Sequence, residues 1–85
     1  MSIYSLEIKL HTQPEAFERM LRVIRHRGFN IENLNLHKKQ NASTNIYLTV
    51  KGEREISFLT SQLNKLIDIV DCQLLTDKQF ASYLD

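Results

Sequence analysis

The chain has 85 residues, of which 42% are hydrophobic and 25% are charged, and its formal net charge is +1. This length leaves room for one domain with a modest core, and the balanced charge gives no strong field to attract nucleic acid or anionic lipid. The single cysteine, Cys72, excludes an internal disulfide. The N-terminus lacks the pattern of a signal peptide, and no apolar run reaches the roughly 20 residues of a membrane span. We expect a cytoplasmic protein with no membrane or nucleic-acid partner.

The first part of the chain predicts a strand followed by a helix. Residues 3–10 alternate, and one face carries the apolar side chains of Tyr4, Leu6, Ile8 and Leu10. Residues 12–15 fit a capping box, with Pro14 in the first helical turn. The helix then runs to about residue 27, and its apolar face comprises Phe17, Met20, Leu21 and Ile24. Gly28 supplies the left-handed residue that ends the helix.

The remainder predicts a hairpin, a second helix and a last strand. Residues 30–39 form a less regular strand, residues 40–43 a polar turn, and residues 45–51 a third strand. An apolar repeat that ends at Leu66 and Ile67 predicts a helix over residues 53–66. Residues 68–76 form the fourth strand, with Val70, Cys72 and Leu74 on one face. We assign residues 1–76 to one domain and residues 77–85 to a short tail.

The element order βαββαβ predicts the fold class. It is typical of the ferredoxin-like α+β sandwich, in which two helices cover one face of a four-stranded antiparallel sheet. The two edge strands of such a sheet carry unpaired backbone groups that can pair with another chain. We therefore expect a homodimer formed through the sheet edges.

The sequence offers no catalytic apparatus. The three histidines lie at no metal-ligand spacing, and Cys72 alternates with apolar residues, so we expect no metal site and no nucleophile. RNA-recognition domains share this element order, but their aromatic stacking platform is reduced here to Tyr47. A basic stripe on the first helix, Arg19, Arg22 and Arg25, is either a docking surface for an acidic partner or a solvated face.

Three stretches carry a family resemblance: PEAFERMLRVIRHRGFNIENLNL, NIYLTV and SQLNKLIDIVDCQ. Together they closely resemble the small regulatory subunits of acetolactate synthase, which are built on the ACT domain. The resemblance covers about residues 3–76, and its most specific pieces are residues 25–34 and 62–71.

The resemblance implies a non-catalytic, regulatory and activating subunit in branched-chain amino-acid (valine, leucine, isoleucine) biosynthesis. The large catalytic subunit of the family carries thiamine diphosphate, a divalent metal such as Mg²⁺, and FAD, and it joins pyruvate to a second 2-oxo acid. The small subunit docks on it, raises its activity and in many members transmits feedback from valine. ACT domains commonly pair side by side, and the effector binds at that interface, against the loop between the first strand and first helix.

The resemblance also implies which positions would bind an effector: Thr12, Glu15, Ala16, Asn30 and Ile31. The family's Asn and Gly in the loop are here Thr12 and Glu15, whereas its Asn after the helix is retained as Asn30. Glu15 would cap the helix start and repel an incoming carboxylate, and Pro14 removes one N–H donor. The chain ends soon after one ACT domain, so it resembles the short isozyme II-like type, and we expect it to be insensitive to valine.

Two alternatives remain open on the sequence. A stand-alone ACT-type amino-acid sensor would need an open ligand site, against which Glu15 argues. A small enzyme of ferredoxin-like fold would need a cluster of polar residues in a cleft, which the sequence does not indicate.

Overall fold

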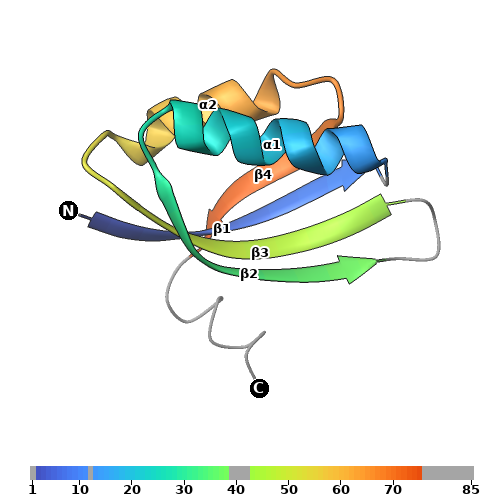
Figure 1. The fold of residues 1–85 in the computed structure, drawn as a ribbon, viewed down its shortest axis with the longest axis horizontal. Coiled ribbons are helices and arrows are strands. Elements are labelled where there is room, and N and C mark those ends of the chain that lie inside the picture. Colours follow the sequence, from blue (N-terminus) through green and yellow to red (C-terminus); the bar gives the residue numbers. More distant parts are fainter. Residues whose placement is uncertain (1, 12, 39–42, 76–85) are drawn as a thin grey trace.

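The elements of the computed structural model follow the predicted order (Figure 1). The structure describes residues 2–11, 13–38 and 43–75. The strands are β1 (Ser2–His11), β2 (Asn30–Lys38), β3 (Ser43–Gly52) and β4 (Ile69–Leu75), and the helices are α1 (Pro14–His26) and α2 (Ile56–Asn64). Thr12, most of the predicted polar turn and the predicted tail lie outside the described residues.

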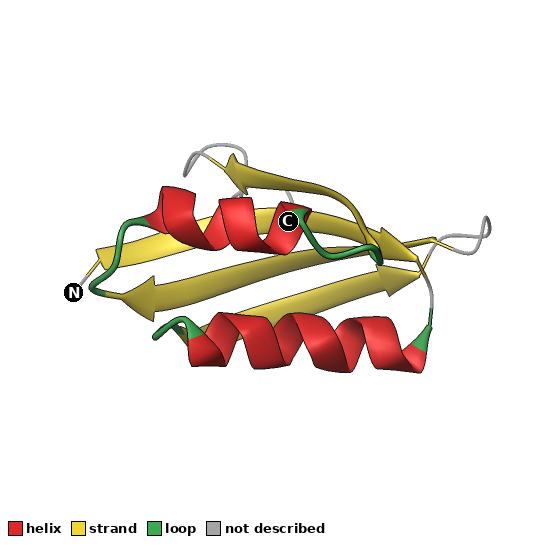
Figure 2. Ribbon diagram, turned by 90° about the horizontal axis from the view of Figure 1, so that it is seen from above, coloured by secondary structure: helices red, strands yellow, loops and turns green. Residues whose placement is uncertain are grey.

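The four strands form one sheet in the order β2-β3-β1-β4, and every neighbouring pair is antiparallel. Both helices lie on the same face of this sheet (Figures 1 and 2). The predicted ferredoxin-like α+β sandwich is therefore confirmed. The edges of the sheet are β2 and β4, so the two longest strands of the sheet, β1 and β3, lie at its centre.

The core fills the space between the sheet and the helices. Its large, fully buried side chains come from both central strands, both helices and the connection before β2: Leu6, Ile8, Leu10, Met20, Ile24, Phe29, Ile46, Leu48, Val50, Leu59 and Leu63. Cys72 also belongs to the core, as the sequence predicted. Its burial, and secondarily the neighbouring charge of Asp71, raises the pKa of the Cys72 thiol to about 12. The thiol therefore stays protonated at neutral pH and lacks the thiolate form that a nucleophile requires.

The prediction for α2 was wrong at both ends. The helix begins at Ile56 because Glu55 has extended backbone angles, φ −63° and ψ 130°, and serves as the N-cap. It ends at Asn64, and the N–H of Leu66 then bonds the carbonyl of Leu63 at 3.1 Å. Leu66 still packs on the core, whereas Ile67 lies beyond the helix and is 88% exposed.

Register shifts explain two further differences. Cys72 and Leu74 pair with residues on the helix-covered side of β1, but a shift at Lys9 and Leu10 skips Val70. Val70 is 52% exposed, but Leu74 is 50% exposed as well, so Cys72 is the only buried member of the three residues predicted on one face. A similar shift at Glu32 interrupts β2, which explains the irregular apolar spacing in that strand.

Candidate functional site

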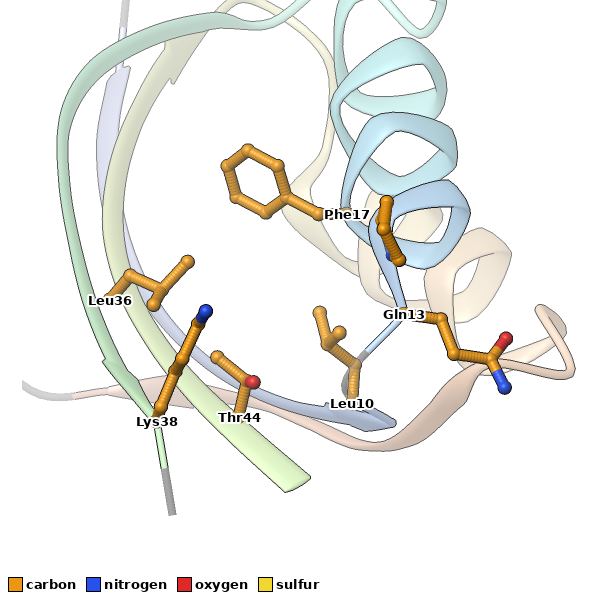
Figure 3. A pocket seen from close by; sticks show the side chains of 7 residues that line it. Leu10, Gln13, Phe17, Leu36, Lys38 and Thr44 are labelled. Carbon is orange, nitrogen blue, oxygen red and sulfur yellow. The ribbon is translucent and has the colours of Figure 1, made fainter. Parts of the chain in front are cut away.

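A groove of about 250 Å³ lies where α1 begins (Figure 3). Its walls come from four elements and the residue before α1: Leu10, Gln13, Pro14, Phe17, Leu36, Lys38 and Thr44. The strand register assembles the floor, because Thr44 of β3 pairs with Lys38 on one side and with Leu10 on the other. The first turn of α1 places Pro14 and Phe17 above this row.

The lining of this groove is mostly apolar. Its polar members are Gln13, Thr44 and Lys38, and Lys38 is the only charged one. Apolar walls with a few polar groups are typical of small-molecule sites, because the walls bind by desolvation and the polar groups orient the ligand. The groove can therefore accept an apolar body together with one negative charge.

The helix start above the groove differs from the prediction. The N-cap is Gln13, with extended angles of φ −142° and ψ 138°, and its side chain makes no capping hydrogen bond. Pro14 at the first helical position explains this, because the residue before a proline is driven into an extended conformation. The Gln13 carbonyl accepts the N–H groups of Ala16 and Phe17 at 3.0 and 3.4 Å. The N-cap is therefore Gln13 and not Thr12 as the predicted capping box required, and Thr12 itself lies outside the described residues.

The predicted effector positions fall at opposite ends of α1. Glu15 and Ala16 lie in its first turn, where Glu15 is exposed and Ala16 is buried, and neither lines the groove. Asn30 and Ile31 begin β2, which follows the other end of the helix. A helix of 13 residues separates its ends by about 18 Å. One copy of the chain therefore does not bring these two groups together.

A second groove, of about 270 Å³, lies at the far end of α1. It includes Asn30, and its other lining residues are Gly28, Lys51, Gly52, Glu53 and Arg54. Gly28 has φ +89° and ends the helix as predicted. A Cβ at Gly52 would lie 2.6 Å from Cδ1 of Phe29, so any other residue there would force the buried Phe29 ring or the backbone to shift. Charges of both signs line this groove, in contrast to the first.

The basic residues of α1 differ in their surroundings. Arg19 pairs with Asp68, which precedes β4. Arg27, just after the helix, donates to Gln62 Oε1 at 3.2 Å and lies 5.5 Å from the Phe58 ring centre. Arg22 and Arg25 are exposed and have no side-chain partner among the described residues. Two members of the predicted docking stripe are thus open to a partner, and Arg19 is already held.

The described residues contain no group of three or more His, Cys, Asp or Glu side chains that could hold a metal ion. Neither of the helices in this part of the chain has the length and hydropathy needed to cross a membrane.

Together, the antiparallel sheet and the two helices on one face define a small α+β module of the ferredoxin-like class. A family model described as "ACT domain" matches residues 12–72. The chain is 40% identical over 83 residues to the acetolactate synthase isozyme 2 small subunits of Escherichia coli K12 and Shigella flexneri. These matches cover 93% of this chain and 95% of each relative. The chain therefore belongs to the ACT-domain family and, within it, to the acetolactate synthase small subunits.

Solved structures agree with this fold. The acetolactate synthase small subunit of Thermotoga maritima superposes with a TM-score of 0.79 at 19% identity, over 91% of this chain and 49% of that one. The ACT domain of the GTP pyrophosphokinase of Chlorobium tepidum superposes with a TM-score of 0.73 at 15% identity, over 86% of this chain and 96% of that one.

Proposed function

We propose that this chain is the non-catalytic regulatory subunit of an acetolactate synthase and that it activates the large catalytic subunit in branched-chain amino-acid synthesis. The observation that carries this proposal is the 40% identity to isozyme 2 small subunits over nearly the full length of both chains. Thiamine diphosphate, Mg²⁺ and FAD would then belong to the large subunit. The complex would work in the cytoplasm, where that synthesis takes place.

Activation without valine control is the second part of the proposal. An amino acid brings both a carboxylate and an ammonium group, and each needs a partner once it leaves water. Pro14 gives no N–H at the start of α1, and the groove beneath it is lined by no acidic residue that could hold an ammonium. The exposed carboxylate of Glu15 in the same turn adds a negative charge near an incoming carboxylate.

For docking on the large subunit, we propose the outward side of α1 around Arg22 and Arg25. Both guanidinium groups are exposed, and neither is held by another part of the described chain. Arg19 would contribute less than the sequence suggested, because it is engaged with Asp68. An acidic surface on the large subunit is the complementary partner.

Self-association through the sheet edges is the fourth part of the proposal. Both β2 and β4 are edge strands with unpaired backbone groups on their outer sides. A site that uses Glu15 and Ala16 together with Asn30 and Ile31 needs two copies of the chain, because these pairs lie at opposite ends of α1. A homodimer satisfies both conditions. We assign residues 1–76 to the pairing domain and residues 77–85 to its tail.

No nucleic-acid partner is proposed. The sheet face opposite the helices carries Tyr47, whose ring would have to stack on a base, but this residue is only 6% exposed. Its hydroxyl donates to Glu7 Oε2 at 3.0 Å and accepts from Asn45 Nδ2 at 3.5 Å. The ring is therefore held within a polar cluster on that face.

Co-expression with an acetolactate synthase large subunit tests the proposal. The tagged chain should retain the large subunit through purification, and the complex should form acetolactate faster than the large subunit alone. A chain that neither retains nor activates the large subunit would instead support the stand-alone sensor, and amino-acid binding by calorimetry would then identify it.

A further inference from the structure

Two arginines lie against one exposed aromatic ring where α1 ends and α2 begins. The Cζ atom of Arg27 is 5.5 Å from the centre of the Phe58 ring, and that of Arg54 is 5.7 Å from it. Phe58 lies in the first turn of α2 and is 37% exposed. Figure 1 shows that the end of α1 and the start of α2 lie at the same end of the helix layer. An aromatic face attracts a guanidinium group, so this ring holds two cations close together.

The charge of the two arginines is not neutralised by the described part of the chain. Neither Arg27 nor Arg54 forms an ion pair there, although Glu53 and Glu55 flank Arg54 in the sequence. Arg27 donates to the uncharged side chain of Gln62 at 3.2 Å, which fixes its position without balancing its charge. Like charges beside one ring repel each other, and a carboxylate that contacts both would offset this repulsion. The pair is therefore suited to an anionic group from outside the chain.

Each of the two arginines also lines an open groove. Arg27 belongs to one of about 240 Å³ on α1, together with Arg22, Val23 and His26. Arg54 belongs to the groove of about 270 Å³ described above, at the end of the same helix. Two grooves joined by an aromatic side chain match a polypeptide segment, which contacts several places at once, better than a small anion, which fills one.

We propose that Arg27, Arg54 and Phe58 anchor the large catalytic subunit, and that they receive a segment of it with an Asp or Glu side chain. A planar guanidinium group can stack on a ring and bind both oxygens of a carboxylate along its edge. An apolar neighbour of that carboxylate packs on Phe58. Arginine and aromatic side chains commonly supply most of the binding energy at an interface. The inference rests on the proposed function, because it extends the docking surface from Arg22 across the end of α1.

Binding of a purified large subunit to the full chain tests the anchor. Arg54→Gln should raise the dissociation constant about tenfold. Its unfolding midpoint should not move, because Arg54 makes no hydrogen bond or ion pair among the described residues. Lys65→Gln is the matched control, since it removes another exposed cation of the helix layer, and it should leave binding unchanged. Arg54→Lys keeps the charge but loses the planar group, and should bind about fivefold more weakly than the unmodified chain.

The outcomes separate this inference from the proposed function. If the unmodified chain binds and Arg54→Gln binds equally well, the anchor is refuted and the subunit assignment stands. Full affinity in Arg54→Lys, or an equal loss in Lys65→Gln, would also refute it, because positive charge alone would then suffice. A large subunit that does not bind even the unmodified chain would overturn the proposed function and the anchor together.

The Arg54→Lys complex also identifies the group that is bound. A carbodiimide joins an amine to a carboxyl group in contact with it, and the two form an amide with loss of water. Mass spectrometry should find position 54 linked to an Asp or Glu of the large subunit, and should find Lys65 unlinked. Links from Lys65 with none from position 54 would refute the proposal. Inorganic phosphate that perturbs the Arg54 Nε–H resonance, with large-subunit binding unaffected by Arg54→Gln, would assign the site to a free anion instead.

Discussion

The two ends of α1 have different surroundings. At its start, Pro14 and Phe17 cover an apolar groove in which Lys38 is the only charge. At its end, two glycines let the chain turn and pass against Phe29, and the adjoining groove carries Lys51, Glu53 and Arg54. The start of the helix therefore borders an open apolar groove, while the end serves the tight connection from α1 into β2. Fold stability should therefore be more sensitive to change at the end of α1 than at its start.

The largest effect that we expect is at the end of α1. Gly52→Ala would place a Cβ 2.6 Å from Cδ1 of Phe29 and 3.1 Å from the carbonyl oxygen of Gly28. The core must shift to admit it, which should lower the free energy of unfolding by about 2 kcal/mol in urea titration.

Gly28→Ala is the companion variant for that test. Its nearest contact would be Arg54 Nε at 3.9 Å, so space is sufficient, but φ +89° is unfavourable for alanine. This should cost about 1 kcal/mol. If Gly52→Ala cost no more than Gly28→Ala, steric contact with Phe29 would not be what fixes glycine at position 52.

An intermediate effect is expected on the outward side of α1, between the two ends. Arg22→Glu reverses an exposed charge in the proposed docking surface and should weaken activation of the large subunit severalfold, more so at low salt. Activation would be measured by titrating the variant into the large subunit at two ionic strengths. Lys65→Glu makes the same charge change after α2 and should leave activation unaltered. Equal losses in the two variants would mean that net charge, rather than the α1 surface, governs docking.

The smallest effect is expected at the start of α1. Gln13 is the N-cap and makes no side-chain capping bond, so Gln13→Ser should raise the free energy of unfolding by about 1 kcal/mol. Gln13→Ala should change it little, because there is no capping bond to lose. A large loss in the alanine variant would show that the Gln13 side chain stabilises the helix start in another way.

The sequence predicted the fold because its signals are local. Alternation in β1, Pro14 and Gly28 at the two ends of α1, and the apolar spacing within that helix each act over a few residues. The errors arose where distant segments decide the outcome. The irregularity at Val70 depends on how β4 pairs with β1, and the end of α2 before Ile67 depends on where the chain must turn into β4.

The groove was not predicted for the same reason. The predicted hairpin already places Lys38 near Thr44, but nothing in the sequence near them indicates Leu10, which joins them through the register of β1 on β3. The distance between the two groups of effector positions could have been predicted from the sequence. The helix predicted between Glu15 and Asn30 already implies that these two residues lie far apart in one copy of the chain. The helix cap could also have been predicted better, since Pro14 at the first helical position makes Gln13, not Thr12, the N-cap.

One measurement tests the central claim, activation without valine control, most directly. The rate of acetolactate formation by the large subunit would be followed as this chain is added to saturation, and valine would then be titrated to millimolar concentration. The account predicts that the rate rises with the chain and stays level as valine increases. A rate that does not rise, or one that falls progressively with valine only when the chain is present, would contradict it.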